Sequence, residues 1–259
     1  MGFCHREVLP GVFQIEDALG VCMTLLTGTK GALLVDAGYG IEDVASFVST
    51  LTDHAVRVLL THGHHDHILG TRWFGEAELF PGDLETASIY SKKEWRERVL
   101  QTAQERGIWT DEAAFLSFEL PPLKPLQEGM IDLGGLGAQV IGCPGHTGGS
   151  AVLYIQEKAL LLTGDNWNPC TWLFFPEAMP VRRYRQQMQK LLSLPFDHVL
   201  CPHRRELYER SMLENFIAGL TDENLAKASF VDTGAYPGIH TLQAQPCEGQ
   251  VLVFDPDRS

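Results

Sequence analysis

Residues 62–67 read HGHHDH directly after the apolar run 56–60, and this cluster constrains the fold more than any other part of the chain. Five of its side chains can bind a metal ion: His62, His64, His65, Asp66 and His67. In extended backbone, alternate side chains point to the same side, so His62 and His64 can reach one ion while His65 points away. A histidine-rich surface loop is the plainer alternative. The apolar run before the cluster instead favours a strand whose end turns out of a sheet edge.

Four further ligand candidates each follow an apolar run elsewhere in the chain: Asp36, His146, Asp165 and His203. Taken singly, a His or Asp at the end of a strand is more often a capping or turn residue. Together, loops that follow separate strands can build one site along a sheet edge. If a helix begins near Asp66, then Asp66 and His67 lie on its first turn and can face a second ion. The sequence therefore predicts a metal centre.

Composition narrows the classes of function. With 44% hydrophobic and 20% charged residues, and no apolar run near the ~20 residues of a membrane span, the chain is typical of a soluble globular protein. The start of the chain lacks a secretory signal pattern, and its six cysteines form no CxxC pair, so we expect a cytoplasmic protein with reduced thiols. A formal charge of −13 argues against nucleic acid as a partner. We expect a small-molecule substrate and no membrane partner, with a homodimer left open.

Patterning along the chain predicts a single domain over 1–259. Short strands are expected over 8–15, 21–27, 32–35, 56–60, 139–141, 151–155, 159–162 and 198–200, with a final pair near 240–243 and 250–254. Helices are expected over 41–51, 181–192 and 207–225. The stretch 83–120 is polar and helix-prone, and we interpret it as a helical insertion near the active site. Two sets of strands with peripheral helices indicate a layered α/β fold.

The motifs resemble the metallo-β-lactamase superfamily, whose pattern is HxHxDH, preceded by an Asp at a strand end and followed by a loop His, an Asp and a last His. These elements occur in this order between Asp36 and His203. The resemblance implies an αββα four-layer sandwich, in which two mixed β-sheets are flanked by helices. It does not extend over the helical stretch 83–120.

The resemblance also implies a ligand set for two divalent metal ions. It divides the candidates into a first site, a second site and a bridging ligand: His62, His64 and His146; Asp66, His67 and His203; Asp165. Asp36 matches a carboxylate that orients a ligand by hydrogen bonding. Zinc is the ion we expect, with iron and manganese open, because mixed His and carboxylate ligands suit all three.

Two divalent ions side by side lower the pKa of a shared water, so the resemblance implies hydrolysis by a hydroxide that bridges the metals. Asp66 and Asp165 are the candidate catalytic residues for accepting or relaying the proton. A bridging Asp165 resembles the glyoxalase II, lactonase and phosphodiesterase branches more than the β-lactamases with a Cys ligand. We expect the target to be an ester, lactone, thioester or phosphodiester bond. The chain has no clear counterpart of the basic glutathione-binding set of glyoxalase II, which argues against a glutathione thioester.

Aromatic side chains gather in two segments that can wall a substrate pocket, namely the stretch 83–120 and the segment after Asp165. Packing of the core is the plainer explanation for any one of them. Trp167 and Asn168 closely follow a predicted ligand, so we expect both to border the site. On that basis, Trp167→Ala would raise the Michaelis constant and leave the metal content unchanged.

Two other functions stay open at this point. The same fold resembles persulfide dioxygenases, which are oxidoreductases with a single iron held by two His and one Asp. Two ions per chain without oxygen consumption would exclude that activity. The second alternative is a metal-binding or sensory protein without catalysis, although the complete ligand set argues against it.

Overall fold

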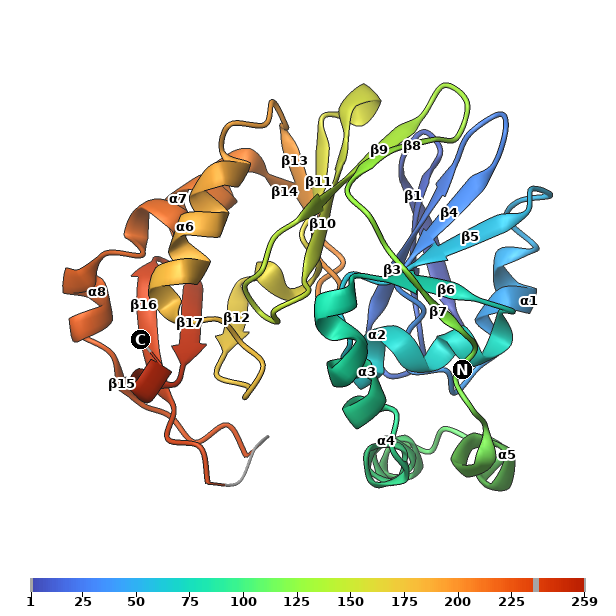
Figure 1. Cartoon of the computed structure of the whole chain (residues 1–259), viewed down its shortest axis with the longest axis horizontal. Helices are drawn as coiled ribbons and strands as arrows, with labels where there is room; N and C mark the ends of the chain where they lie inside the picture. Colours follow the sequence, from blue (N-terminus) through green and yellow to red (C-terminus); the bar gives the residue numbers. More distant parts are fainter. Residues whose placement is uncertain (1, 235–237, 259) are drawn as a thin grey trace.

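The computed structural model describes residues 2–234 and 238–258, and three β-sheets organise this part of the chain (Figure 1). The first sheet has seven strands in sequence order: β1 (Cys4–Leu9), β2 (Val12–Glu16), β3 (Cys22–Thr27), β4 (Ala32–Val35), β5 (Val56–Leu59), β6 (Ala77–Leu79) and β7 (Leu123–Pro125). Strands β1 to β4 pair antiparallel and β4 to β7 pair parallel, which makes the sheet mixed.

The second sheet has six strands in the order β14-β13-β11-β10-β9-β8. Their bounds are β8 (Gly129–Asp132), β9 (Gly137–Gly142), β10 (Ala151–Ile155), β11 (Leu160–Leu162), β13 (His198–Leu200) and β14 (Tyr208–Glu209). β11 and β13 pair parallel, and the other neighbours pair antiparallel. β10 reads AVLYI and is buried along its whole length, as expected for a strand that is covered on both faces.

The two larger sheets pack face to face, and helices cover their outer faces (Figure 1). Apolar side chains from both sheets form the core between them: Leu26, Leu33 and Leu59 from the first sheet, and Val140, Leu153 and Leu162 from the second. One further core lies between the first sheet and the helices on its outer face, and another lies between the second sheet and α6 and α7. This arrangement confirms the predicted αββα sandwich.

The helices are short, and their apolar faces explain where they pack. Their bounds are α1 (Val44–Val48), α2 (His65–Ile68), α3 (Leu84–Tyr90), α4 (Lys93–Glu105), α5 (Glu112–Ser117), α6 (Val181–Leu191), α7 (Arg210–Gly219) and α8 (Asp222–Ala226). In α6 the buried residues Val181, Tyr184, Met188 and Leu191 recur every three or four positions and so form one stripe.

Within residues 2–234 and 238–258, none of the helices has both the length and the apolar character of a membrane span.

A third, smaller sheet extends beyond the predicted architecture. It has four strands in the order β12-β17-β16-β15: β12 (Cys170–Leu173), β15 (Ser229–Phe230), β16 (Leu242–Cys247) and β17 (Gln250–Phe254). The sequence indicated the final strand pair, but it did not indicate β12. β12 is short, and its parallel partner β17 lies at the far end of the chain, so local patterning carries little signal for it.

The single strand expected over 8–15 is wrong, because the chain turns within that range. The turn places Gly11 at φ 79°, in the left-handed region that favours glycine. A Cβ at Gly11 would also lie 2.8 Å from the backbone oxygen of Thr27. β1 and β2 therefore form an antiparallel hairpin in place of one strand.

Loops from both large sheets meet at one edge of the sandwich. The candidate ligands follow four strand ends: the cluster 62–67 after β5, His146 after β9, Asp165 after β11 and His203 after β13. Asp36, which supports His67, follows a fifth, at the end of β4. Backbone hydrogen bonds join the sheets there. The Ala151 N–H donates to the Thr61 oxygen over 2.8 Å, and the Cys22 N–H donates to the Pro202 oxygen over 2.7 Å. This edge therefore brings together segments that are far apart in the sequence.

A substitution at Gly70 tests how tightly the segment after α2 packs against the chain that follows β4. It lies in the 3₁₀ turn η1 (Leu69–Trp73), where a Cβ would be 1.8 Å from the backbone oxygen of Ala37. We predict that Gly70→Ala lowers the free energy of unfolding by about 2–4 kcal/mol, because backbone has to move to relieve the clash. Urea unfolding measures this. Gly75→Ala is the control, since nothing lies within 4 Å of a Cβ there, and an equal effect at both glycines would contradict the prediction.

Candidate metal centre

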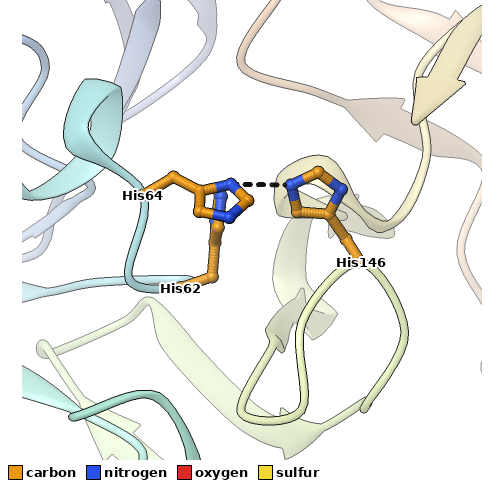
Figure 2. Close-up of side chains that lie close together, drawn as sticks. All are labelled: His62, His64 and His146. Carbon is orange, nitrogen blue, oxygen red and sulfur yellow. Dashed lines mark hydrogen bonds between the residues drawn. The ribbon is translucent and has the colours of Figure 1, made fainter. Parts of the chain in front are cut away.

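Three buried imidazoles form the first candidate ligand group. His62 and His64 lie in the loop after β5, and His146 faces them from the loop after β9 (Figure 2). One nitrogen of each ring lies within 4.8 Å of the others, and the side chains are 1%, 4% and 2% exposed, respectively. His64 Nδ1 is 2.9 Å from His146 Nε2. The nitrogens are close enough to share one ion.

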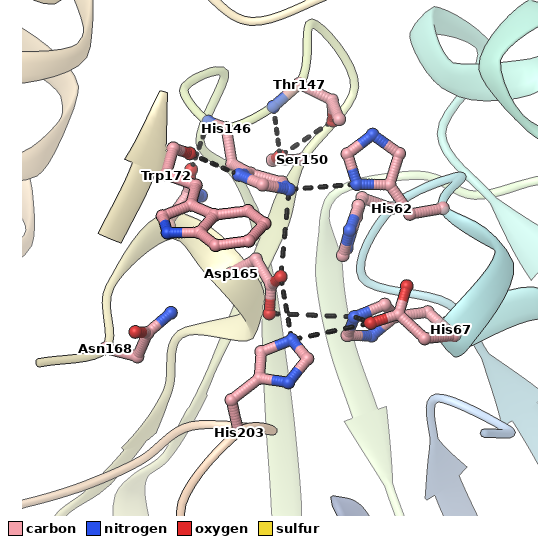
Figure 3. Close-up of polar contacts among 12 residues, drawn as sticks. His62, His67, His146, Thr147, Ser150, Asp165, Asn168, Trp172 and His203 are labelled. Atoms are coloured by element: carbon pink, nitrogen blue, oxygen red, sulfur yellow. Dashed lines mark hydrogen bonds and ion pairs between the residues drawn. The ribbon is translucent and has the colours of Figure 1, made fainter. Parts of the chain in front are cut away.

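The second candidate group contains two carboxylates and two imidazoles: Asp66, His67, Asp165 and His203. α2 begins at His65, which puts Asp66 and His67 on its first turn. Figure 3 shows Asp165 between His146 and His203. Its Oδ2 is 3.0 Å from His203 Nε2 and 3.7 Å from His146 Nε2. Asp165 therefore adjoins both groups, which is the position that a bridging ligand requires.

Hydrogen bonds on the far side of two rings determine which ring nitrogen faces the site. Asp36 accepts a hydrogen bond from His67 Nδ1 over 2.9 Å, and the backbone oxygen of Trp172 accepts one from His146 Nδ1 over 2.7 Å. Both rings consequently turn Nε2 inward. Asp36 also accepts the Thr61 N–H over 2.7 Å, so it joins the end of β4 to the loop that carries the cluster.

Three inward-facing atoms are buried and make no hydrogen bond with the described residues: His62 Nε2, His67 Nε2 and Asp165 Oδ1. His67 Nε2 and Asp165 Oδ1 lie 3.6 Å apart, which is an ion-pair contact but too long for a hydrogen bond. A buried polar atom without a hydrogen bond costs about 1–3 kcal/mol. Divalent cations would satisfy these atoms, because imidazole nitrogen and carboxylate oxygen are ligands of zinc, iron and manganese. The residues present therefore fit the metal centre that the sequence predicts.

Charges within the cluster keep its carboxylates ionised. Burial acts to raise the pKa of Asp165, but the neighbouring His203 and His67 hold that pKa well below the usual range. Burial likewise opposes ionisation of Asp66, and the charge of His67 again outweighs it and lowers the pKa. For His62, burial and then the nearby His67 lower the pKa well below its ordinary value, so the ring is neutral. The same carboxylates raise the pKa of His67 and of His203, against the effect of burial. Because metal ions bind ionised carboxylates and neutral imidazoles, these two rings would release a proton when an ion binds.

Asp83 joins the two loops that carry the histidines of the first group. Its side chain is fully buried, and Oδ2 accepts the Gly63 N–H over 2.8 Å and the Thr147 hydroxyl over 2.7 Å. Its Oδ1 accepts the Gly149 N–H over 2.7 Å. A Cβ at Gly149 would lie 2.6 Å from the Asp83 nitrogen, so this close approach requires glycine. Nothing in the sequence around Asp83 marks it as part of the site, since it is the first residue of the polar, helix-prone stretch 83–120.

Two more supporting residues were missed. Glu177 Oε1 lies 2.5 Å from His64 Nε2, and Asn166 Oδ1 accepts the His146 N–H over 2.9 Å. Asn166 directly follows Asp165, and that position was a usable signal. Glu177 lies in the loop after β12, and nothing in the neighbouring sequence marks it as part of the site.

A cavity of about 730 Å³ borders the candidate ligands, and Asn168 is among the residues that line it. The expectation that Trp167 also borders the cavity is wrong. Its ring is fully buried in the core beneath α6 and α7, and its Nε1–H donates to Gln250 Oε1 over 2.9 Å. Trp172, which lies on β12, lines the cavity instead.

A comparison with family models matches residues 17–203 to the Metallo-beta-lactamase superfamily. The matched range includes every candidate ligand and most of the two large sheets. The chain therefore belongs to the metallo-β-lactamase superfamily, and metal-dependent hydrolase is the class of enzyme that its fold and site define.

Curated relatives and solved structures give more specific similarities. The chain is 26% identical over 242 residues to the acyl-coenzyme A thioesterase MBLAC2 of Gallus gallus, covering 84% of this chain and 80% of that protein. It is 29% identical over 183 residues to the hydroxyacylglutathione hydrolase of Rhodobacter capsulatus, covering 68% of this chain but only 57% of that protein. A solved structure, TTHA1623 in a di-iron-bound form, is 25% identical with a TM-score of 0.53, covering 74% of this chain and 91% of that one.

The burial of Trp167 changes the result expected from its substitution. We predict that Trp167→Ala lowers the free energy of unfolding by about 3–5 kcal/mol, because the truncation leaves a cavity in the core and removes the donor to Gln250. Urea unfolding provides the measurement. Trp109→Ala is the control, since Trp109 is 86% exposed and its loss should change stability by about 0.5 kcal/mol or less. Unchanged stability with a raised Michaelis constant would place Trp167 at the cavity after all.

Asp83→Asn tests the link between the two histidine loops. We predict a loss of about 1–3 kcal/mol in the free energy of unfolding, because an amide cannot accept all three hydrogen bonds. Metal should also be lost faster to a chelator, since the loops lose their common anchor. The control is Asp132→Asn, which removes one partner of the exposed ion pair with Lys30. If both variants behave like the wild type, Asp83 does not position the site.

Proposed function

We propose that this chain is a dinuclear metal-dependent hydrolase whose target is the thioester of a small molecule. The observation that carries the proposal is the convergence of two ligand groups on Asp165, which adjoins both. The names of both curated relatives describe hydrolysis of an acyl group on a thiol carrier, coenzyme A in one and glutathione in the other. These names favour a thioester over the ester, lactone and phosphodiester bonds that the sequence left open.

Bound divalent ions would supply a water of lowered pKa and would polarise the substrate carbonyl. The residues that would hold them divide as the resemblance implies: His62, His64 and His146; Asp66, His67 and His203; Asp165 between them. Asp66 is the better placed proton acceptor of the two carboxylates. Its Oδ2 faces His67 and His203 at 3.4 and 3.5 Å, and its other oxygen lies 3.6 Å from the non-ligand His65. Both oxygens of Asp165, by contrast, face candidate ligands.

A mononuclear iron oxidoreductase is the second candidate function. It requires two His and one Asp, and it has no need for a second set of ligands. Here the ligand atoms of the second group lie within 4.8 Å of one another beside the first group, which favours two ions. The di-iron-bound form of TTHA1623 keeps iron open as the metal of a dinuclear site, alongside zinc and manganese.

We also propose that the protein works in the cytoplasm. All six cysteines carry free thiols, and three of them are buried, which suits a reducing compartment. A homodimer stays open, and light scattering on the purified protein can test it.

Metal content and thioester hydrolysis test the proposal together. For protein purified without a His tag, we predict about two divalent ions per chain by elemental analysis, with less metal in His62→Ala and Asp165→Ala. Both variants should lose at least about 100-fold in kcat/KM on an acetyl thioester. His54→Ala, which replaces an exposed histidine away from the site, is the control. A wild-type protein without metal would overturn the proposal, and one iron per chain with oxygen consumption would support the oxidoreductase.

A further inference from the structure

The part of the cavity wall that lies away from the candidate ligands carries positive charge, although the chain as a whole carries a formal charge of −13. Apart from the candidate ligands, the described lining residues include no carboxylate, and the charged ones are Arg98 and Arg204. Away from the candidate ligands Asp66 and Asp165, a negatively charged group therefore meets two guanidinium groups and no carboxylate among the described lining residues.

Neither arginine forms an ion pair with a carboxylate of the described residues. The guanidinium of Arg98 lies over the Trp95 ring, 4.6 Å from its centroid, and Arg204 Nη1 donates to the His203 backbone oxygen over 3.0 Å. The adjacent Arg205, in contrast, pairs with Glu16. Both cavity arginines thus keep N–H donors for a ligand, in a protein where carboxylates outnumber cationic side chains.

Aromatic rings form the other part of the cavity walls. Tyr90 and Trp95 come from α3 and α4, and their ring centroids are 4.5 Å apart. Trp172 and Phe175 come from β12 and the loop after it, with centroids 6.2 Å apart. Such rings favour burial of an apolar group, and a cavity of about 730 Å³ is of the size that holds a small organic ligand.

We propose that the substrate has two chemically distinct ends: an apolar acyl chain that packs against the aromatic rings, and an anionic thiol carrier that binds Arg98 and Arg204. The inference rests on the proposed thioester hydrolysis. In that reaction the C–S bond breaks, the water oxygen joins the acyl carbon, and the thiol leaves with a proton. Coenzyme A and glutathione share the required chemistry, since each is an anionic thiol.

The charge of the carrier is tested with octanoyl thioesters of coenzyme A, of glutathione and of uncharged N-acetylcysteamine. We expect the wild type to have a higher kcat/KM on the thioesters of the anionic carriers than on the thioester of the neutral carrier. In the double variant Arg98→Ser/Arg204→Ser, the kcat/KM on an anionic carrier divided by the kcat/KM on the neutral carrier should fall by about tenfold. In the wild type this ratio should also fall with ionic strength, because salt screens exposed charges. Arg182→Ser, an exposed arginine on α6 outside the cavity, should leave the ratio unchanged. An unchanged ratio in the double variant would overturn the inference.

The acyl end is tested by comparing octanoyl and acetyl thioesters of the same carrier. Trp172→Ala should lower the preference for octanoyl by about fivefold, because the chain loses apolar contact. Trp109→Ala serves as the exposed control. Equal preferences in wild type and Trp172→Ala would overturn the placement of the acyl chain.

The two anionic carriers distinguish whether the arginines bind phosphates or carboxylates. The same assay separates failure of the proposed thioester hydrolysis from failure of the proposed two-ended substrate. If the arginine substitutions lower kcat/KM more for the coenzyme A thioester than for the glutathione thioester, the arginines bind phosphates. A larger loss for the glutathione thioester indicates that they bind carboxylates. A wild type that cleaves no thioester, neutral ones included, would overturn the proposed function itself. A wild type that cleaves all carriers equally, with or without the arginines, would overturn the substrate inference alone.

Discussion

The structure depends on keeping two ionised carboxylates, Asp66 and Asp165, among the buried side chains at one edge of an apolar sandwich. Removing a charge from water is costly unless opposite charge lies close by. The imidazoles of His67 and His203 provide part of that compensation, and divalent cations would provide more. Among the described residues, the groups that surround both carboxylates come from several loops. The ligands consequently come from loops of both large sheets, and the two sheets have to meet at that edge.

Loops at strand ends move more easily than the strands themselves, so a site built from them needs anchors. Asp36 holds His67 and the start of the cluster loop, and Asp83 joins that loop to the one that carries His146. Backbone hydrogen bonds between the sheets add further support. These contacts come from residues that bind neither metal nor substrate, yet they determine how closely the ligands converge.

The groups that hold metal and the groups that would hold substrate lie on different elements. The candidate ligands follow the ends of the central strands, whereas the cavity walls come largely from α3, α4 and the β12 region. The residues of α4 and β12 can therefore change without displacing the ligands. This separation explains how one fold and one ligand set can serve hydrolases with different substrates.

The sequence by itself indicated the candidate ligands and their order, because HxHxDH and the strand-end residues His146, Asp165 and His203 depend on short spacing and on patterning that is local. The αββα layering also followed from the resemblance that these motifs carry. Only the tertiary structure decided the roles of residues whose partners are distant. It buried Trp167 against Gln250, put Trp172 at the cavity and paired β12 with β17. It also brought Asp83 to the two loops that carry histidines, and Glu177 to His64. Local spacing cannot determine such contacts, because each one depends on how separate layers pack together.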